Sequence, residues 1–152
     1  MAGEQDQAMN TENPKAGVAA EVASCVIWVS NLERSLNFYC DVFSCSVLIR
    51  ESDMALVLAP NGFQLYLHAE PTFRHRGLGT LGVQYLMWAT DSEASLQRIA
   101  QRLKTHDVAA YSYTQGGVTF VEGCDPDRER VIVAYPTPRR LPREVIAKRL
   151  HG

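Results

Sequence analysis

The sequence contains an internal repeat, and this repeat limits the folds that the chain can adopt. The segment that starts at Val26, VIWVSNLERSLNFY, aligns with the segment that starts at Leu86, LMWATDSEASLQRI, at a constant offset of sixty residues. Four of the fourteen aligned positions are identical, among them Trp28 with Trp88. A period of this length is typical of a duplicated structural unit. A generic α+β fold whose halves agree by chance is the alternative.

Each copy of the repeat has the pattern of a strand followed by a helix. Apolar and β-branched residues predict strands at 25–29 and 85–89. Ser30 and Thr90 are each followed three residues later by glutamate, which predicts a capping box at the start of a helix. Apolar residues then recur with helical spacing after both caps. The repeat therefore predicts two equivalent strand–helix units.

Three more apolar runs follow each predicted helix, separated by turn residues such as Pro60-Asn61-Gly62. They predict strands near 46–50, 55–58 and 63–68 in the first copy and near 109–113, 118–122 and 131–135 in the second. The predicted fold class is α+β, with two βαβββ modules at 22–70 and 82–136. We expect residues 21–136 to form a single domain, with a disordered leader at 1–20. A C-terminal tail, 137–152, is expected to contain a short helix from about Pro142.

Composition and charge exclude several classes of partner. A length of 152 residues with 46% hydrophobic content suits one domain with its own core. The net charge of −2 does not favour nucleic acid, and no apolar run approaches the ~20 residues that cross a bilayer. The four cysteines lack CxxC spacing, and the polar start of the chain is not of the secretory type. We therefore expect a cytoplasmic protein with reduced thiols.

Three segments together resemble the vicinal oxygen chelate superfamily. They are SCVIWVSNLERSLNFYCDVF, VQYLMWATDSEASLQRIAQRL and DPDRERVIVAYP, and the resemblance extends over about residues 22–136. This superfamily includes glyoxalase I, the bleomycin-resistance proteins, the extradiol dioxygenases and the fosfomycin-resistance enzymes. The resemblance implies that the two modules form a cup of curved mixed sheet, with the helices outside and a ligand inside.

The same resemblance predicts where metal ligands would stand. In the metal enzymes of the family a histidine precedes the helix-capping residue by seven positions, which leads from Asn31 to Ser24 and from Asp91 to Gln84. The glutamate of the last strand corresponds to Ile132. These side chains cannot form a site of two histidines and one carboxylate. We therefore expect no metal and no cofactor.

Alternation along the strands predicts which side chains line the cup. If the strands keep the family's inward direction, both tryptophans face inward, together with residues of the strand at 63–68. The predicted ligand-binding residues are Ser24, Trp28, Tyr66, His68, Gln84, Trp88 and Ile132. An apolar and aromatic lining of this kind suits a flat organic ligand. In the alternative interpretation the two tryptophans fill the space between the sheets as core.

Other polar residues are given lesser roles by the sequence. Tyr111 and Tyr113 are interpreted as ordinary exposed strand tyrosines. Glu122 is expected at the surface, at the end of its strand, and a carboxylate near the cup is the alternative. His75 lies in a glycine-containing linker that is interpreted as a lid or a dimer contact.

Three functional hypotheses follow from these patterns. The first is a metal-independent protein, expected to be a homodimer, that binds a small apolar or aromatic molecule in the cup. The second is a glyoxalase-like enzyme, a lyase, isomerase or dioxygenase relative, that uses Gln84, His68 or the tyrosines on a carbonyl substrate. The third is a structural or regulatory domain whose cup is filled by its own side chains.

Overall fold

A computed structural model describes residues 22–72 and 85–137. The elements, in chain order, are β1 (Ser24–Val29), α1 (Leu32–Phe43), β2 (Ser46–Arg50), β3 (Met54–Leu58), β4 (Gln64–Ala69), β5 (Tyr85–Ala89), α2 (Glu93–His106), β6 (Tyr111–Gln115), β7 (Val118–Cys124) and β8 (Arg130–Tyr135). The predicted leader, the linker with His75, Gln84 and the predicted tail helix lie outside the described residues. In the described part of the chain, neither helix is long and apolar enough to cross a membrane.

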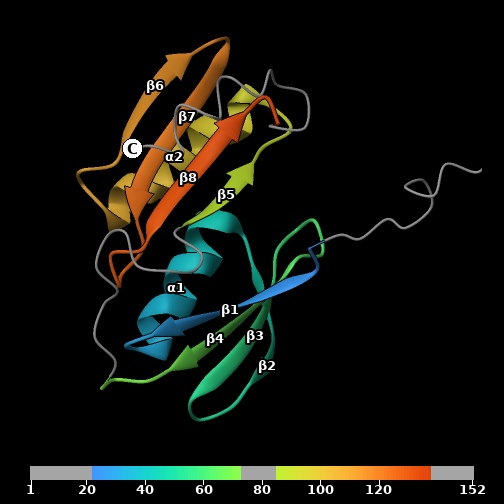
Figure 1. The fold of residues 1–152 in the computed structure, drawn as a ribbon, viewed down its shortest axis with the longest axis vertical. Helices are drawn as coiled ribbons and strands as arrows, with labels where there is room; N and C mark the ends of the chain where they lie inside the picture. The colour runs from blue at the N-terminus through green and yellow to red at the C-terminus, as the bar shows by residue number, and fades with distance from the viewer. Residues whose placement is uncertain (1–21, 73–84, 138–152) are drawn as a thin grey trace, which may run out of the picture.

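The strands form two four-stranded sheets of the same topology (Figure 1). Sheet A has the order β1-β4-β3-β2, and sheet B has the order β5-β8-β7-β6. In each sheet the first strand pairs in parallel with the last strand of its module, and the remaining pairs are antiparallel. Neither sheet is closed. The predicted fold class, α+β with two βαβββ modules, is confirmed.

Both helices begin later than the capping boxes predict. The N-cap of α1 is Asn31 and that of α2 is Ser92, and each side chain accepts a hydrogen bond from a backbone N–H of the first turn. The prediction of Ser30 and Thr90 as caps is wrong. The Ser30 hydroxyl instead donates to Asp127 in the other module, so it is not available to the helix end.

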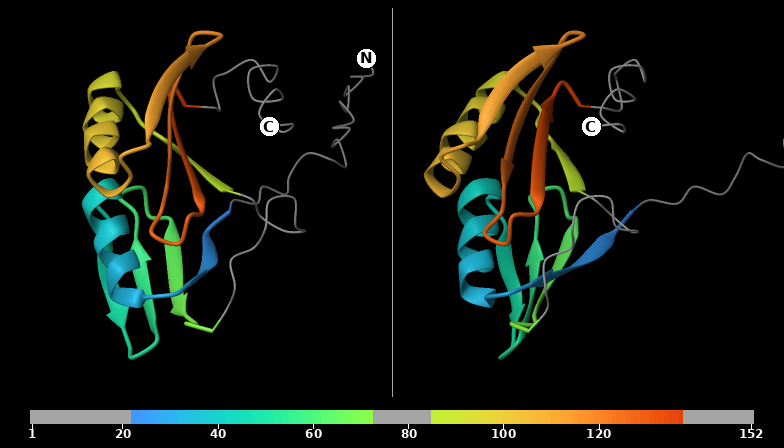
Figure 2. Two further views of the ribbon diagram at one scale, coloured as in Figure 1. Left: turned by 90° about the vertical axis from the view of Figure 1, so that its left-hand side faces the viewer. Right: turned by 60° about the vertical axis from the view of Figure 1, so that its left-hand side comes forward.

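The two modules share one apolar core between the helices and the sheets. Leu36 of α1 and Leu65 of β4 belong to the same cluster as Leu96 and Leu103 of α2 and Val133 of β8. The ribbon views show α1 and α2 stacked along one side of the molecule, with both sheets lying beside them (Figure 2). Because each helix is amphipathic, its apolar stripe is buried against its own sheet.

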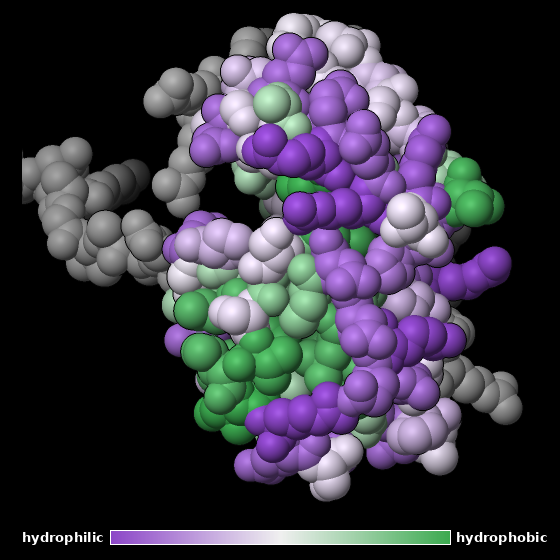
Figure 3. Space-filling view, turned by 180° about the vertical axis from the view of Figure 1, so that it is seen from behind, coloured by the Kyte–Doolittle hydropathy of each residue, from purple (hydrophilic) through white to green (hydrophobic). Residues whose placement is uncertain are grey.

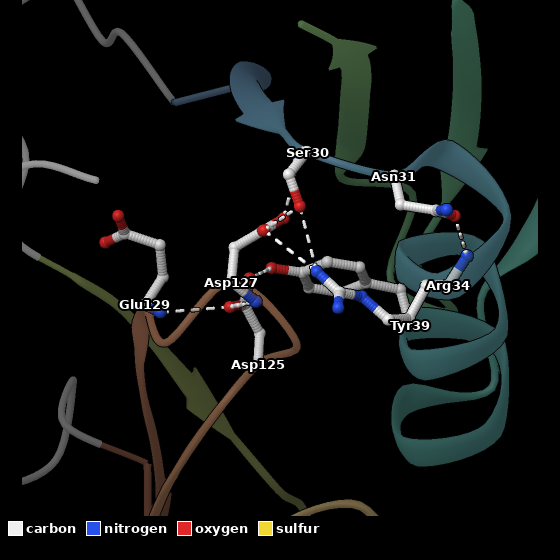
Figure 4. Close-up of polar contacts among 7 residues, drawn as sticks. All are labelled: Ser30, Asn31, Arg34, Tyr39, Asp125, Asp127 and Glu129. Atoms are coloured by element: carbon white, nitrogen blue, oxygen red, sulfur yellow. Dashed lines mark hydrogen bonds and ion pairs between the residues drawn. The ribbon is translucent and has the colours of Figure 1, made fainter. Parts of the chain in front are cut away.

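A turn of the second module also contacts the start of α1 (Figure 4). Asp127, which is buried, accepts hydrogen bonds from the Ser30 backbone N–H at 2.9 Å and from the Ser30 hydroxyl. Arg34 Nη2 lies 3.1 Å from the same carboxylate. A negative charge at this position also complements the dipole at the N-terminus of α1. The contact fixes module two against the N-terminal end of α1.

Asp125 of the same turn contacts the middle of α1. Its carboxylate accepts the Tyr39 hydroxyl at 3.1 Å and the backbone N–H groups of Asp127 and Glu129 at 2.8 and 2.9 Å. Burial raises the pKa of Asp125, although these hydrogen bonds oppose the rise. Burial and the neighbouring Asp125 charge raise the pKa of Tyr39 well above its ordinary value. Tyr39 is therefore a hydrogen-bond donor that joins the modules.

Candidate functional site

Each sheet has two faces, a helix face that packs on the core and a distal face that points away from its helix. In sheet A, Cys25 and Ile27 pack on the core, so the alternate residues of β1 belong to the distal face. The parallel register places Ser24 beside Gln64, Val26 beside Tyr66 and Trp28 beside His68. Four predicted ligand-binding residues therefore share the distal face of sheet A: Ser24, Trp28, Tyr66 and His68.

Two of these residues form an aromatic pair. The ring centroids of Trp28 and His68 lie 4.3 Å apart, and the rings are tilted by 38°. Trp28 is 47% exposed, which is a large fraction for an indole in a strand. His68 Nε2 lies 3.4 Å from Oδ2 of Asp53, the residue immediately before the neighbouring strand β3. The pair presents an aromatic surface with a polar edge.

Other apolar side chains of sheet A are also exposed. Val26 is exposed next to Trp28, and β2, at the opposite edge of the sheet, exposes Val47, Leu48 and Ile49. In the view from behind, a broad hydrophobic area covers part of the half of the molecule where Figure 1 places sheet A (Figure 3). Contiguous exposed apolar surface of this kind marks interaction sites in soluble proteins.

Trp88 does not join Trp28 on a distal face. Its ring stacks on Phe43 of α1, with a centroid distance of 3.9 Å and an interplanar angle of 12°, and it also lies near Tyr39. Leu86 packs on the same core. The prediction that both tryptophans point inward together is wrong, because Trp88 lies between β5 and the α1 helix of the other module.

The core-facing positions of strand and helix do not keep the same offset between the two modules. Leu36 of α1 corresponds to Leu96 of α2 at an offset of sixty, whereas Ile27 of β1 corresponds to Trp88 of β5 at sixty-one. A shift of one residue reverses the face of every side chain in a strand.

Ile132 lies on the distal face of sheet B, as the alternation along its strand predicts. It is 0% exposed and packs with Val118, Phe120 and Ala134. Three partly buried side chains pack against this cluster: Tyr85, Met87 and Tyr113. A ligand in contact with the described residues therefore has readier access to the sheet A residues than to Ile132. Gln84, the remaining predicted site residue, lies outside the described residues.

A polar cluster on the distal face of sheet B was not anticipated. Glu122 is buried rather than exposed, and its carboxylate accepts the hydroxyls of Tyr111 at 3.0 Å and Tyr113 at 2.7 Å. Arg130 Nη2 lies 3.0 and 3.3 Å from its two oxygens. Alternation along β6 places Tyr111 and Tyr113 on one face, but Glu122 joins them only through the register of β6 with β7, which the sequence does not give.

Comparisons with known proteins support the fold. A family model described as the Glyoxalase/Bleomycin resistance protein/Dioxygenase superfamily matches residues 21–127. Among solved structures, a glyoxylase/bleomycin resistance protein/dioxygenase domain from Frankia sp. EAN1pec has a TM-score of 0.69 and 17% identity over 77% of this chain and 98% of its own. No curated protein sequence matches the chain.

Two named relatives have the same fold. The fosfomycin resistance protein FosX from Listeria monocytogenes has a TM-score of 0.64 and 15% identity, over 82% of this chain and 100% of its own. A lactoylglutathione lyase from Agrobacterium tumefaciens has a TM-score of 0.57 and 15% identity, over 76% and 93% of the two chains. The chain belongs to the Glyoxalase/Bleomycin resistance protein/Dioxygenase superfamily.

The side chains present do not fit the metal site that the resemblance describes. Ser24 and Ile132 stand where ligands are expected, and Ile132 is packed among apolar residues. Within 22–72 and 85–137, no group of three or more His, Cys, Asp or Glu side chains is placed to hold a metal ion. His68 is paired with Asp53, and Glu122 is hydrogen-bonded to three side chains. No step of a reaction is therefore derived through a metal.

Proposed function

We propose that this protein binds a small apolar or aromatic molecule on the distal face of sheet A without a metal ion. The observation that carries this proposal is the half-exposed Trp28 indole beside the His68 ring. An indole held at a fixed tilt offers a flat apolar surface at low entropic cost, because its neighbours already restrict it. The Tyr66 hydroxyl on the same face donates to Gln64 Oε1 at 3.4 Å, and its oxygen can accept a hydrogen bond from a polar group of the ligand.

Metal independence is part of the proposal because of the residue types at the inward positions. A serine hydroxyl and an isoleucine side chain are not ligands that hold a transition metal at neutral pH. The surface around Trp28 is instead suited to stacking and to burial of apolar area. Such binding releases water from both partners and needs no cofactor.

The proposal is tested by calorimetric titration with 2-acetylnaphthalene, a neutral flat ketone, after treatment of the protein with a chelator. We expect saturable binding that falls at least about tenfold in Trp28→Ala, because loss of one aromatic contact removes about 1–2 kcal/mol. Val108→Ala is the matched control, since Val108 is an exposed apolar residue after α2. Equal affinity of Trp28→Ala and the unaltered protein would overturn the proposal.

A second candidate function is favoured by the His68–Asp53 pair. A histidine whose ring nitrogen faces a carboxylate is arranged as a general base with an orienting partner. In that case the protein is a glyoxalase-like enzyme that removes a proton next to a carbonyl group. Deuterium exchange of the methyl protons of methylglyoxal, followed by NMR, tests it. Exchange above the buffer rate that is lost in His68→Ala supports the enzyme, and an unchanged rate removes His68 from it.

We also propose a cytoplasmic homodimer formed by one domain, residues 21–136, from each chain. Support for the domain comes from the core that both modules share. Support for the cytoplasm comes from the four cysteines, all of which are free thiols. Support for the dimer comes from the exposed apolar side chains of β2. Light scattering after gel filtration gives the mass directly, and a monomer at micromolar concentration would contradict the dimer.

A further inference from the structure

We propose that the distal face of sheet B carries a second binding site, which takes a planar aromatic carboxylate through the guanidinium of Arg130. This inference goes beyond the function proposed above, because it concerns the other sheet, a different set of residues and a ligand of defined charge. It rests on the way Glu122 and the surrounding aromatic rings hold Arg130.

Arg130 is fixed in place by a buried partner. Its Nη2 lies 3.0 Å from Glu122 Oε2 and 3.3 Å from Oε1, and the Glu122 side chain is only 5% exposed. Its guanidinium carbon also lies 5.3 Å from the centre of the Tyr85 ring, in the geometry of a cation–π contact. A buried carboxylate and a ring thus define the plane and direction of the guanidinium.

The remaining donors of Arg130 are available to a ligand. Every hydrogen bond that Arg130 makes to residues 22–72 and 85–137 uses Nη2, so Nε and Nη1 have no acceptor among them. The side chain is 36% exposed, which leaves part of the guanidinium open to solvent. Both two-donor edges of a guanidinium include Nη2, so a carboxylate is held here by a single charge-assisted hydrogen bond from Nη1 or Nε.

Glu122 acts as a positioning residue and does not bind the ligand directly. Its two oxygens accept hydrogen bonds from Tyr113, from Tyr111 and from Arg130. Since a carboxylate has about four acceptor positions, little capacity remains for a further donor or for a cation. The positively charged guanidinium of Arg130 is therefore the group that contacts the ligand, and an anion is the matching ligand.

Aromatic rings beside Arg130 favour a flat ligand. Tyr111 and Tyr113 are stacked with a centroid distance of 5.7 Å, and Tyr113 stacks on Phe120 at 5.3 Å. Tyr85, under the guanidinium, lies on the same face. Stacked rings next to a fixed cation suit a molecule with a ring at one end and a carboxylate at the other.

The test compares two probes that differ in charge. In a Trp28→Ala background, which removes the site proposed on sheet A, 2-naphthoate and its neutral analogue 2-naphthamide are titrated by calorimetry. We expect 2-naphthoate to bind about tenfold more tightly or better, since one charge-assisted contact is enough for that ratio. Arg130→Gln should abolish the preference. Arg128→Gln should preserve it, because Arg128 is an exposed arginine of the turn that precedes β8.

Folding of the variants is controlled separately. Arg130→Gln leaves the buried Glu122 without its cation, so the double variant Glu122→Gln/Arg130→Gln, which keeps the pair neutral, is measured as well. Loss of the preference in both variants, with circular dichroism unchanged in the double variant, supports the site. Equal binding of the two probes, binding of neither, or a preference that persists in the double variant would overturn it. None of these outcomes depends on Trp28, so failure here leaves the sheet A proposal intact.

Discussion

The two tryptophans should differ in their contribution to stability, although the repeat aligns them. Trp88 is partly buried and stacks on Phe43, packed against the core that joins the modules. Replacement of such a side chain by alanine removes its apolar burial and leaves a cavity, at a cost of about 3–5 kcal/mol. We therefore expect Trp88→Ala to lower the free energy of unfolding by about 4 kcal/mol.

The corresponding loss for Trp28 is smaller because 47% of it is already exposed. Full burial of an indole, at roughly 150–250 Å² and about 25 cal/mol per Å², contributes about 4–6 kcal/mol. About half of this, reduced further by residual burial in the unfolded chain, gives roughly 2 kcal/mol for Trp28→Ala.

Urea denaturation followed by circular dichroism measures both values. A difference of roughly 2 kcal/mol corresponds to a separation of about 1 M between the two midpoints for a urea m-value of about 2 kcal/mol/M. Trp28→Phe and Trp88→Phe are the matched controls, since they keep a ring at each position. A loss of stability for Trp28→Ala as large as that for Trp88→Ala would refute the assignment of Trp28 to an exposed sheet face and of Trp88 to the contact between the modules.

Three further predictions concern the core, the turn between the modules and the thiols. Gly123→Ala should destabilise the protein by about 1–3 kcal/mol, because the new methyl group would lie 2.9 Å from the Leu103 Cδ2 atom, and Leu103→Ala should relieve part of this loss in a double-mutant cycle by urea denaturation. Burial raises the pKa of Asp125, so its contribution to the free energy of unfolding is fully present below the ordinary carboxyl pKa of about 4 and is lost as pH rises through the raised pKa. The stability of the wild type relative to Asp125→Asn, measured by urea denaturation, should therefore fall as pH rises between these two pKa values, and an increase would contradict the prediction. Burial raises the pKa of Cys45 to about 12, so iodoacetamide at pH 8 should label the half-buried Cys40 before the buried Cys45 in a peptide mass map, and equal labelling rates of these two thiols would contradict this.

Most of the strands could be predicted because their signals are local. The runs at 46–50 and 85–89 match β2 and β5 in full, and every other strand begins and ends within about two residues of its predicted bounds. Apolar runs between turn residues suffice for this, since the turns fix where each strand stops. Apolar spacing also predicts a helix after the first strand of each module, although the capping residues were predicted one or two positions too early.

Which side chains of β5 face the core could not be predicted, because the spacing between the core-facing residues of strand and helix differs between the modules. Ser35 with Ser95 and Leu36 with Leu96 fix the offset of the helices, and the tryptophan identity extends that offset falsely into the strand. The prediction of Ser30 as a helix cap was also wrong, because its contacts are distant in the sequence. Ser30 has a partner ninety-seven positions away, and no local pattern contains that information.

The site on sheet A was partly predictable, and the cluster on sheet B was not. Alternation along β1 and β4 is enough to place Trp28, Tyr66 and His68 on one face. The burial of Glu122 depends instead on the register of β6 with β7 and on the approach of Arg130 from β8. Such contacts between strands follow from tertiary structure, because a carboxylate near a strand end is usually exposed.

The most direct test of the account is fluorescence titration with 2-acetylnaphthalene of two variants that each keep one tryptophan, in the presence of a chelator. Trp88→Phe retains only Trp28, and Trp28→Phe retains only Trp88. The account predicts saturable quenching of emission in Trp88→Phe and an unsaturable, weak response in Trp28→Phe. Saturable quenching confined to Trp28→Phe, or quenching that appears only after a transition metal is added, would contradict a metal-independent site on the distal face of sheet A.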